Sequence, residues 1–309
     1  MKLKSFAEFL FTLGLFLIFI GLFLDKHETI EAIIQQYISP NTGDKSISEV
    51  NLYHRDYDFM FVQNTKNYIP HSHQDIINII YTALNAGRDS FYFNCPKDYK
   101  DCFSDVEKLA NDQTTLSDIN NYVHPFNTFS HIGTSYNSIG TRIDVSITKS
   151  YPEKEIPMIV EKVNEIYNRL YREDYSLKDN IRSFHDYIIN NSKYDSDRVD
   201  FGTIKYESDK AFGPLFEGYA ICGGYTDLMQ LFLEKLNVKN YRISSDGHIW
   251  NAVYIDGEWL HLDLTWDDPV TSDGKNYLEH SYFLINTNKL LSMGDTQHSF
   301  NRDKYLEFK

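Results

Sequence analysis

The segment from residue 218 to residue 266 constrains the fold of this 309-residue chain more than any other. It opens with the run GYAICGGY, in which Cys222 precedes two glycines. Apolar residues then recur at helical spacing, at Tyr225, Leu228, Met229, Phe232 and Leu236. This period predicts a buried helix, with Cys222 at or just before its first residue.

Two runs with strand-like alternation follow that helix, Ile249–Ile255 and Glu258–Trp266. The pair Asp256-Gly257 between them is a strong signal for a two-residue hairpin turn. The segment therefore predicts a helix followed by an antiparallel pair of strands.

The hairpin register brings two polar residues together. It places His248 opposite Thr265, so that Asp263 becomes a diagonal neighbour of His248 on the same face. We expect this face to meet the helix that carries Cys222. The opposite face is apolar and is expected to form the core, through Ile249, Val253, Ile255, Leu260, Leu262 and Leu264.

A thiol, an imidazole and a carboxylate in this order are the parts of a cysteine nucleophile, its base and the residue that orients the base. The start of a helix favours a thiolate at Cys222, because unpaired N–H groups and the helix dipole point at it. We expect Gly223 and Gly224 to leave room for a substrate carbonyl, with the Cys222 N–H as one oxyanion donor. Together with His248 and Asp263, this predicts acyl transfer at a carbonyl, without a metal or an organic cofactor.

Other polar residues receive weaker interpretations. His261 shares the Asp263 face and is a second choice for the imidazole, whereas His185 is expected to be packed or solvated on a helix. His298 receives no role. The run Asp267-Asp268-Pro269 is typical of a turn.

The N-terminus differs from the rest of the chain. Lys2 and Lys4 precede an uncharged run, Phe9–Leu24, that would extend about 24 Å as a helix. A signal peptide is an alternative, but no small-x-small cleavage site follows, so we favour an uncleaved membrane anchor. The lysines predict that this end lies inside the cell and the bulk of the chain outside.

Charge and cysteine content fit this location. The formal net charge of -14 argues against a general nucleic-acid binder, which needs a basic face. Cys95 and Cys102 flank a short polar loop and either form a disulfide outside the cell or remain two unpaired thiols. With a disulfide there, Cys222 would be the one free thiol.

The chain divides into four predicted segments. These are a membrane anchor or signal segment (1–26), a juxtamembrane linker (27–56), an α/β region (57–151) and a catalytic domain (152–309). In the α/β region we expect helices at Asp75–Ala86, Asp105–Asn111 and Leu116–Val123, and strands at Ser90–Phe93 and Arg142–Thr148. In the last segment, helices are expected over Ile156–Tyr171 and after Ser176, with Asp179 completing an acidic capping box.

Five motifs resemble the transglutaminase-like superfamily, whose core is a papain-like cysteine-hydrolase fold. They are AFGPL (211–215), GYAICGGY (218–225), GHIWN (247–251), GEWLHLDLTWDDP (257–269) and YFLI (282–285), the last resembling a trailing strand. The resemblance covers about Ile156–Ile285 and is nearest to the bacterial cell-surface branch. It implies that Cys222 is the nucleophile, His248 the base and Asp263 the orienter.

We therefore expect an α+β protein with an N-terminal transmembrane helix, a small α/β region and a transglutaminase-like core, in which a Cys-bearing helix packs on an antiparallel sheet. The expected function is that of an extracytoplasmic enzyme acting on peptide or carboxamide carbonyls, with a protein or peptide substrate, cell-wall associated in one interpretation. The alternative is a non-enzymatic surface protein that uses a degenerate cleft for binding.

Overall fold

The computed structural model describes residues 47, 49–136, 140–270 and 277–308. The predicted membrane anchor and most of the linker lie outside these residues. None of the helices within the described part is long and apolar enough to cross a bilayer.

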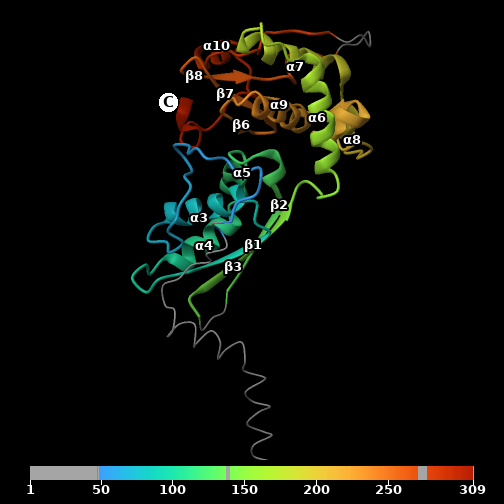
Figure 1. Cartoon of the computed structure of the whole chain (residues 1–309). Coiled ribbons are helices and arrows are strands. Elements are labelled where there is room, and N and C mark those ends of the chain that lie inside the picture. Colours follow the sequence, from blue (N-terminus) through green and yellow to red (C-terminus); the bar gives the residue numbers. More distant parts are fainter. Residues whose placement is uncertain (1–46, 48, 137–139, 271–276, 309) are drawn as a thin grey trace, which may run out of the picture.

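The predicted α/β region forms a three-stranded antiparallel sheet flanked by helices (Figure 1). The sheet order is β1-β3-β2. Its elements are α3 (His73–Asn85), β1 (Ser90–Asn94), α4 (Cys102–Asn111), α5 (Gln113–Asn120), the 3-10 turn η2 (Pro125–Asn127), β2 (Phe129–Tyr136) and β3 (Arg142–Lys149). The helices and strands expected here are present. Strand β2, which the sequence analysis missed, pairs with β3 through an irregular register near Phe129.

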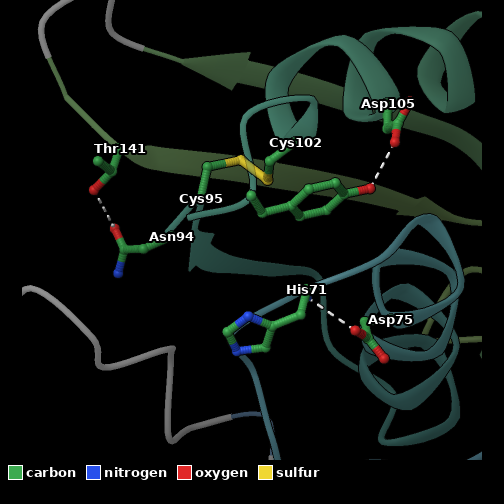
Figure 2. Close-up of a disulfide and its surroundings, with 8 residues drawn as sticks. His71, Asp75, Asn94, Cys95, Cys102, Asp105 and Thr141 are labelled. Carbon is green, nitrogen blue, oxygen red and sulfur yellow. Dashed lines mark hydrogen bonds between the residues drawn. A yellow bond between two sulfur atoms is a disulfide. The ribbon is translucent and has the colours of Figure 1, made fainter. Parts of the chain in front are cut away.

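A disulfide joins Cys95 to Cys102 and closes the loop between β1 and α4 (Figure 2). On α4, Asp105 accepts a hydrogen bond from the Tyr99 hydroxyl at 2.6 Å. Asn94, at the end of β1, bonds Thr141 across the sheet. The open question about these two cysteines is settled in favour of the bond, and Cys222 is the free thiol.

In the remaining part, one long helix packs against a second antiparallel sheet, ordered β6-β7-β8, and two further long helices pack against that helix (Figure 1). Its elements are α6 (Ile156–Leu170), α7 (Leu177–Asn191), β4 (Lys193–Tyr194), α8 (Ser196–Phe201), the π-helix η3 (Gly213–Glu217), β5 (Tyr219–Ala220), α9 (Cys222–Lys235), β6 (Asn240–Ser245), β7 (His248–Ile255), β8 (Glu258–Leu262), α10 (Thr287–Ser292) and η4 (Leu306–Phe308). Ser176 caps α7 by accepting a bond from the Asp179 N–H, as expected. The protein is thus a mixed α+β structure with antiparallel sheets.

The expectation that α9 meets the His/Asp face of the hairpin is wrong. Apolar residues of α9 pack with Val253, Ile255 and Leu260 in one core cluster, on the opposite face. The face of Trp250 and Ala252 belongs to the other cluster, which includes the C-terminal residues Tyr305 and Phe308. A helix with an apolar surface gains most by covering the apolar face of a sheet, so the polar face is left for other segments.

The hairpin forms in the expected register, with Ile255 opposite Glu258. Strand β8, however, ends at Leu262 rather than at Trp266. Beyond it, Asp263 Oδ1 accepts bonds from the N–H groups of Thr265 (2.9 Å) and Trp266 (3.4 Å), which turns the chain away from the sheet. The predicted trailing strand is reduced to a single bridge between Ile285 and His261.

Buried contacts join the two parts of the molecule. The Arg55 guanidinium lies 2.5 Å from Glu234 of α9 and donates to the Tyr122 carbonyl at 2.7 Å. The Tyr122 ring stacks on Tyr241 of β6 with centroids 4.7 Å apart. One core cluster therefore extends from α3–α5 to the sheet β6-β7-β8. The division of the chain at residues 26, 56 and 151 remains a prediction from the sequence.

Candidate active site

Cys222 is the first residue of α9, as the sequence predicts. The preceding residue, Ile221, is extended and provides no side-chain cap for the helix. Its backbone N–H instead donates to the Ser208 carbonyl at 2.8 Å, which fixes the entry of the chain into the helix. The first-turn N–H groups of a helix have no partner inside it, so the positive end of the helix dipole lies at Cys222.

The two glycines after Cys222 have a different role from the one expected. A Cβ at Gly224 would lie 2.3 Å from the Ser208 carbonyl oxygen, and one at Gly223 would lie 2.6 Å from that of Asp209. Both positions face the backbone of the 208–210 loop, not an open substrate site. The glycines are needed because this loop lies directly against the first turn of α9.

Side chains from the segment before α9 hold that loop. Asp195 accepts a bond from the Ser208 hydroxyl at 2.6 Å, and Arg198 lies 2.9 Å from Asp209. The short parallel pair β4–β5 brings Tyr194 level with Ala220, two residues before Cys222. The start of α9 is therefore fixed from two sides.

His248 and Asp263 meet, and the Cys222 side chain lies close enough to His248 to contribute to its raised pKa. The His248 Nε2 atom lies 2.5 Å from Asp263 Oδ2. Both side chains are almost fully buried, 3% and 2% exposed. Two bonds tie α9 to the β7 strand that carries His248: Thr226 donates to the Ile249 carbonyl at 3.0 Å, and Asn251 donates to the Thr226 carbonyl at 3.1 Å.

Electrostatics favour a charged His248–Asp263 pair. Burial lowers the pKa of His248, but the charge of Asp263, its hydrogen bond and the nearby Cys222 side chain outweigh burial and raise that pKa to about 10. Burial raises the pKa of Asp263, yet His248 and His298 hold it well below its usual range. Burial, followed by the charges of Cys222 and other neighbours, raises the pKa of Tyr194. These shifts place an imidazolium next to the thiol.

His298 also belongs to this cluster and was missed from the sequence. Its Nε2 lies 2.8 Å from Asp263 Oδ2, and its Nδ1 lies 2.8 Å from Asp295 Oδ1. Its ring contacts His248 edge-on, with centroids 5.3 Å apart. The pattern Asp295-x-x-His298 is the one local signal, since it places a carboxylate three residues before the imidazole.

The other polar residues considered from sequence lie elsewhere. His261 is fully buried and bonds Trp250 and Thr287, at 3.0 and 3.1 Å, rather than Cys222. Burial lowers the pKa of His261 to about 3, so it stays neutral. It lies on the face covered by the C-terminal segment.

At the predicted turn, the side chains of Asp267 and Asp268 are buried and take part in a hydrogen-bond network. Asp267 accepts bonds from His185 Nε2 at 3.2 Å and from the Tyr282 N–H at 2.9 Å. Asp268 accepts a short bond from the Tyr225 hydroxyl, and burial raises its pKa to about 6. His185 is therefore a packed residue, one of the two interpretations that the sequence left for it.

Two groups of described residues have donor atoms close enough to hold a metal ion. They are His185, Asp186 and His280, and His248, Asp263 and His298, with all donor atoms of a group within 4.8 Å of one another. In both groups the imidazole nitrogens already lie at hydrogen-bond distance from a carboxylate oxygen. These nitrogen atoms therefore already have hydrogen-bond partners within the protein.

No protein-family model and no curated protein matches the sequence. Among solved structures, the chain is similar to a transglutaminase, with 14% identity and a TM-score of 0.33 over 45% of each chain. It is also similar to a candidate cysteine protease from Cytophaga hutchinsonii, with 16% identity and a TM-score of 0.27 over 44% of this chain and 61% of the other. The chain thus spans less than two thirds of either of these two proteins.

Proposed function

We propose that the protein is a cysteine enzyme of transglutaminase-like type, which acts on peptide or carboxamide carbonyls through Cys222, His248 and Asp263. The observation that carries the proposal is that a thiol at a helix start lies beside a buried imidazole, which is itself bonded to a buried carboxylate. Each residue alone has ordinary structural explanations. Joined in series they match the requirements of nucleophilic catalysis.

In the proposed reaction, His248 holds the thiol proton and Cys222 attacks the substrate carbonyl as a thiolate. The carbon–sulfur bond forms, and the imidazolium then protonates the leaving ammonia or amine. The resulting thioester reacts with water, which gives hydrolysis or deamidation, or with a second amine, which gives a cross-link. Asp263 keeps the imidazole oriented and stabilises its charge throughout.

Negative charge on the carbonyl oxygen needs donors close to the sulfur. The Cys222 N–H lies at the uncapped start of α9 and is proposed as the first of these. The loop at 208–210 fixes the position of this N–H, because Ile221 is bonded to Ser208. The enzyme would thus hold its donor in place before the substrate arrives.

The proposed location is outside the cytoplasm, with residues 1–26 as a membrane anchor. The Cys95–Cys102 disulfide supports it, since such bonds persist in oxidising compartments. A protein or peptide substrate at the cell surface or in the wall fits this location. The formal charge of -14 does not favour nucleic acid as a partner.

Alkylation by iodoacetamide tests the nucleophile. Because the other two cysteines form a disulfide, Cys222 is the free thiol that reacts. At pH 6 an ordinary thiol is only about 0.3% ionised, so an imidazolium-paired Cys222 should react about tenfold faster than N-acetylcysteine, or more. Mass spectrometry of wild type and Cys222→Ala measures the rate and its site. A wild-type rate equal to that of N-acetylcysteine contradicts the proposal.

A second experiment determines whether water or an amine attacks the thioester. Glutamine-containing peptides are incubated with the protein, with and without a primary amine, and the products are analysed by mass spectrometry. A mass gain on Cys222 identifies the thioester, and amine incorporation distinguishes cross-linking from hydrolysis. A surface protein that only binds peptide would keep its binding in Cys222→Ala and form no acyl adduct.

A further inference from the structure

Two imidazoles share one oxygen of the Asp263 carboxylate. His248 Nε2 and His298 Nε2 lie 2.5 and 2.8 Å from Asp263 Oδ2. The second imidazole comes from the C-terminal segment, 35 residues after Asp263. A nucleophile, a base and its orienter do not by themselves require a second imidazole on the carboxylate.

Each ring nitrogen of His298 faces a carboxylate oxygen. Its Nε2 faces Asp263 Oδ2, and its Nδ1 faces Asp295 Oδ1, both at 2.8 Å. An ionised carboxylate only accepts hydrogen bonds, so a ring with a carboxylate oxygen at each nitrogen can satisfy both only by donating from both nitrogens. The Asp295 oxygen also accepts the His298 backbone N–H at 2.9 Å, which fixes the pair locally.

The ring of His298 is held tightly. Its side chain is 2% exposed. It stacks on Tyr282 with centroids 4.9 Å apart, meets Trp250 edge-on at 4.9 Å, and lies 5.2 Å from the Trp266 ring. Such packing restricts the imidazole to one orientation, in which Nε2 points at Asp263.

We propose that His298, held by Asp295, is a positioning residue that fixes the Asp263 carboxylate and adds a positive charge beside the Cys222–His248 pair. This inference rests on the proposed function of that pair. It makes the C-terminal segment part of the active site. Because the remaining Asp263 oxygen accepts the N–H groups of Thr265 and Trp266, the carboxylate then has donors on both oxygens.

The charge on His298 has a predictable sign of effect. Removing a cation about 5 Å away makes proton loss from the Cys222–His248 pair harder by about one pH unit. The thiol should therefore need a higher pH to react. The titratable and charged groups around the His298 ring, the carboxylate it contacts and the neighbouring His261 are Asp263, Asp295, His248, His261, Tyr282, Arg302, Tyr194 and Cys222.

The test is the pH profile of iodoacetamide alkylation at Cys222 in the full chain. His298→Gln keeps one amide N–H for Asp263 but carries no charge. We expect its plateau rate to stay within about threefold of wild type while the midpoint of the acid limb moves up by about one pH unit. His298→Leu removes the donor as well and should lower the rate at pH 6 by about tenfold or more. Asp295→Asn should move the midpoint in the same direction as His298→Gln.

His131→Gln, an exposed histidine on β2, is the matched control and should leave the profile unchanged. Thermal unfolding of each variant separates loss of folding from loss of positioning. If His298→Leu does not fold, the test rests on His298→Gln and Asp295→Asn. Unchanged midpoints in both, with Cys222 still hyperreactive, overturn the inference and leave the proposed function standing. A wild-type Cys222 no faster than N-acetylcysteine overturns the proposed function itself.

Discussion

The protein contains the same arrangement of polar groups in two places. At the candidate active site, His248 and His298 share one oxygen of Asp263. On the α7 side of the molecule, His185 Nδ1 and His280 Nε2 share Asp186 Oδ1, each at 2.8 Å. Two imidazoles on one carboxylate oxygen are therefore not in themselves a sign of catalysis in this chain.

The two clusters differ in what the inner histidine contacts on its other side. His248 lies beside the Cys222 side chain, whereas His185 Nε2 faces a second carboxylate, Asp267, at 3.2 Å. In both, hydrogen bonds to carboxylates outweigh burial and raise the pKa of the inner histidine. An imidazolium next to a thiol can exchange a proton with a nucleophile, while one between two carboxylates is only neutralised.

They also differ in access to water. The side chains of Asp263 and His298 are each 2% exposed, but those of Asp186 and His280 are 31% and 38% exposed. Interactions between buried charges are stronger and less screened by salt than those at the surface. We therefore expect changes in the Asp263 cluster to have larger effects.

The largest expected effect is a difference in the alkylation rate of Cys222 between variants of His248 and His185, the inner histidines of the two clusters. His248→Gln removes the imidazolium from Cys222 and should slow its alkylation at pH 6 by about tenfold or more, because the thiol returns to ordinary ionisation. The matched variant His185→Gln should leave that rate within about threefold and lower stability by about 1–3 kcal/mol, since Asp267 loses a donor. Alkylation kinetics and urea unfolding measure both. Equal losses of alkylation in the two variants would remove the distinction between the clusters.

A second prediction concerns the start of α9, which lies beside the Asp263 cluster. The Asp186 cluster has no such helix start with a thiol among its described neighbours. Gly224→Ala should lower the free energy of unfolding by about 1–3 kcal/mol and slow alkylation, because the new methyl group collides with the Ser208 carbonyl. Gly202→Ala is the control: its φ of +68° strains an alanine, but no atom lies within 4 Å. It should cost about 1 kcal/mol and leave alkylation unchanged. Urea unfolding and alkylation report the two effects, and a Gly224→Ala protein as stable and reactive as wild type contradicts this view of the loop.

The raised pKa of His248 predicts a pH dependence of stability. The folded value of about 10 exceeds the unfolded value of about 6.5, so the folded chain binds the extra proton between them. Its contribution is complete below about pH 6.5 and is lost as the pH rises towards 10. The stability difference between wild type and His248→Gln should shrink by at least about 1 kcal/mol from pH 7 to pH 10. Urea unfolding across this range measures it, and a constant difference would show that His248 is not charged in the folded state.

The smallest effect is expected at the exposed end of the second cluster. His280→Gln removes a half-exposed partner of Asp186 and should change stability by less than about 0.5 kcal/mol, with alkylation unaltered. The comparison is with His298→Gln, the equivalent change at the buried cluster. A shift of the alkylation profile in His280→Gln would mean that the two clusters are coupled.

Much of the candidate site could be predicted because its signals are local. The apolar period after Cys222 fixed the start of α9, and Asp256-Gly257 fixed the register of the hairpin. The approach of His248 to Asp263 follows from that register even though β8 ends early, because the turn after Leu262 begins with Asp263 itself. Backbone hydrogen bonding and turn chemistry depend on neighbours in the chain, so they can be read from it.

The missed features all depend on segments far apart in sequence. His298 reaches Asp263 across 35 residues, and the glycines of α9 face a loop that only the fold brings there. The run at Asp267 lies in the core because His185, from another helix, supplies a donor. None of these pairings leaves a periodic or turn pattern that a sequence could display.

The sequence by itself determined where the helix, the hairpin and the nucleophile candidate begin, since propensity and hydrogen-bond register act over a few residues. Only the tertiary structure decided which face of the sheet α9 covers and which imidazole joins Asp263. Those choices follow from the total apolar surface that can be buried and from the partners that buried charges require, and both are properties of the whole folded chain.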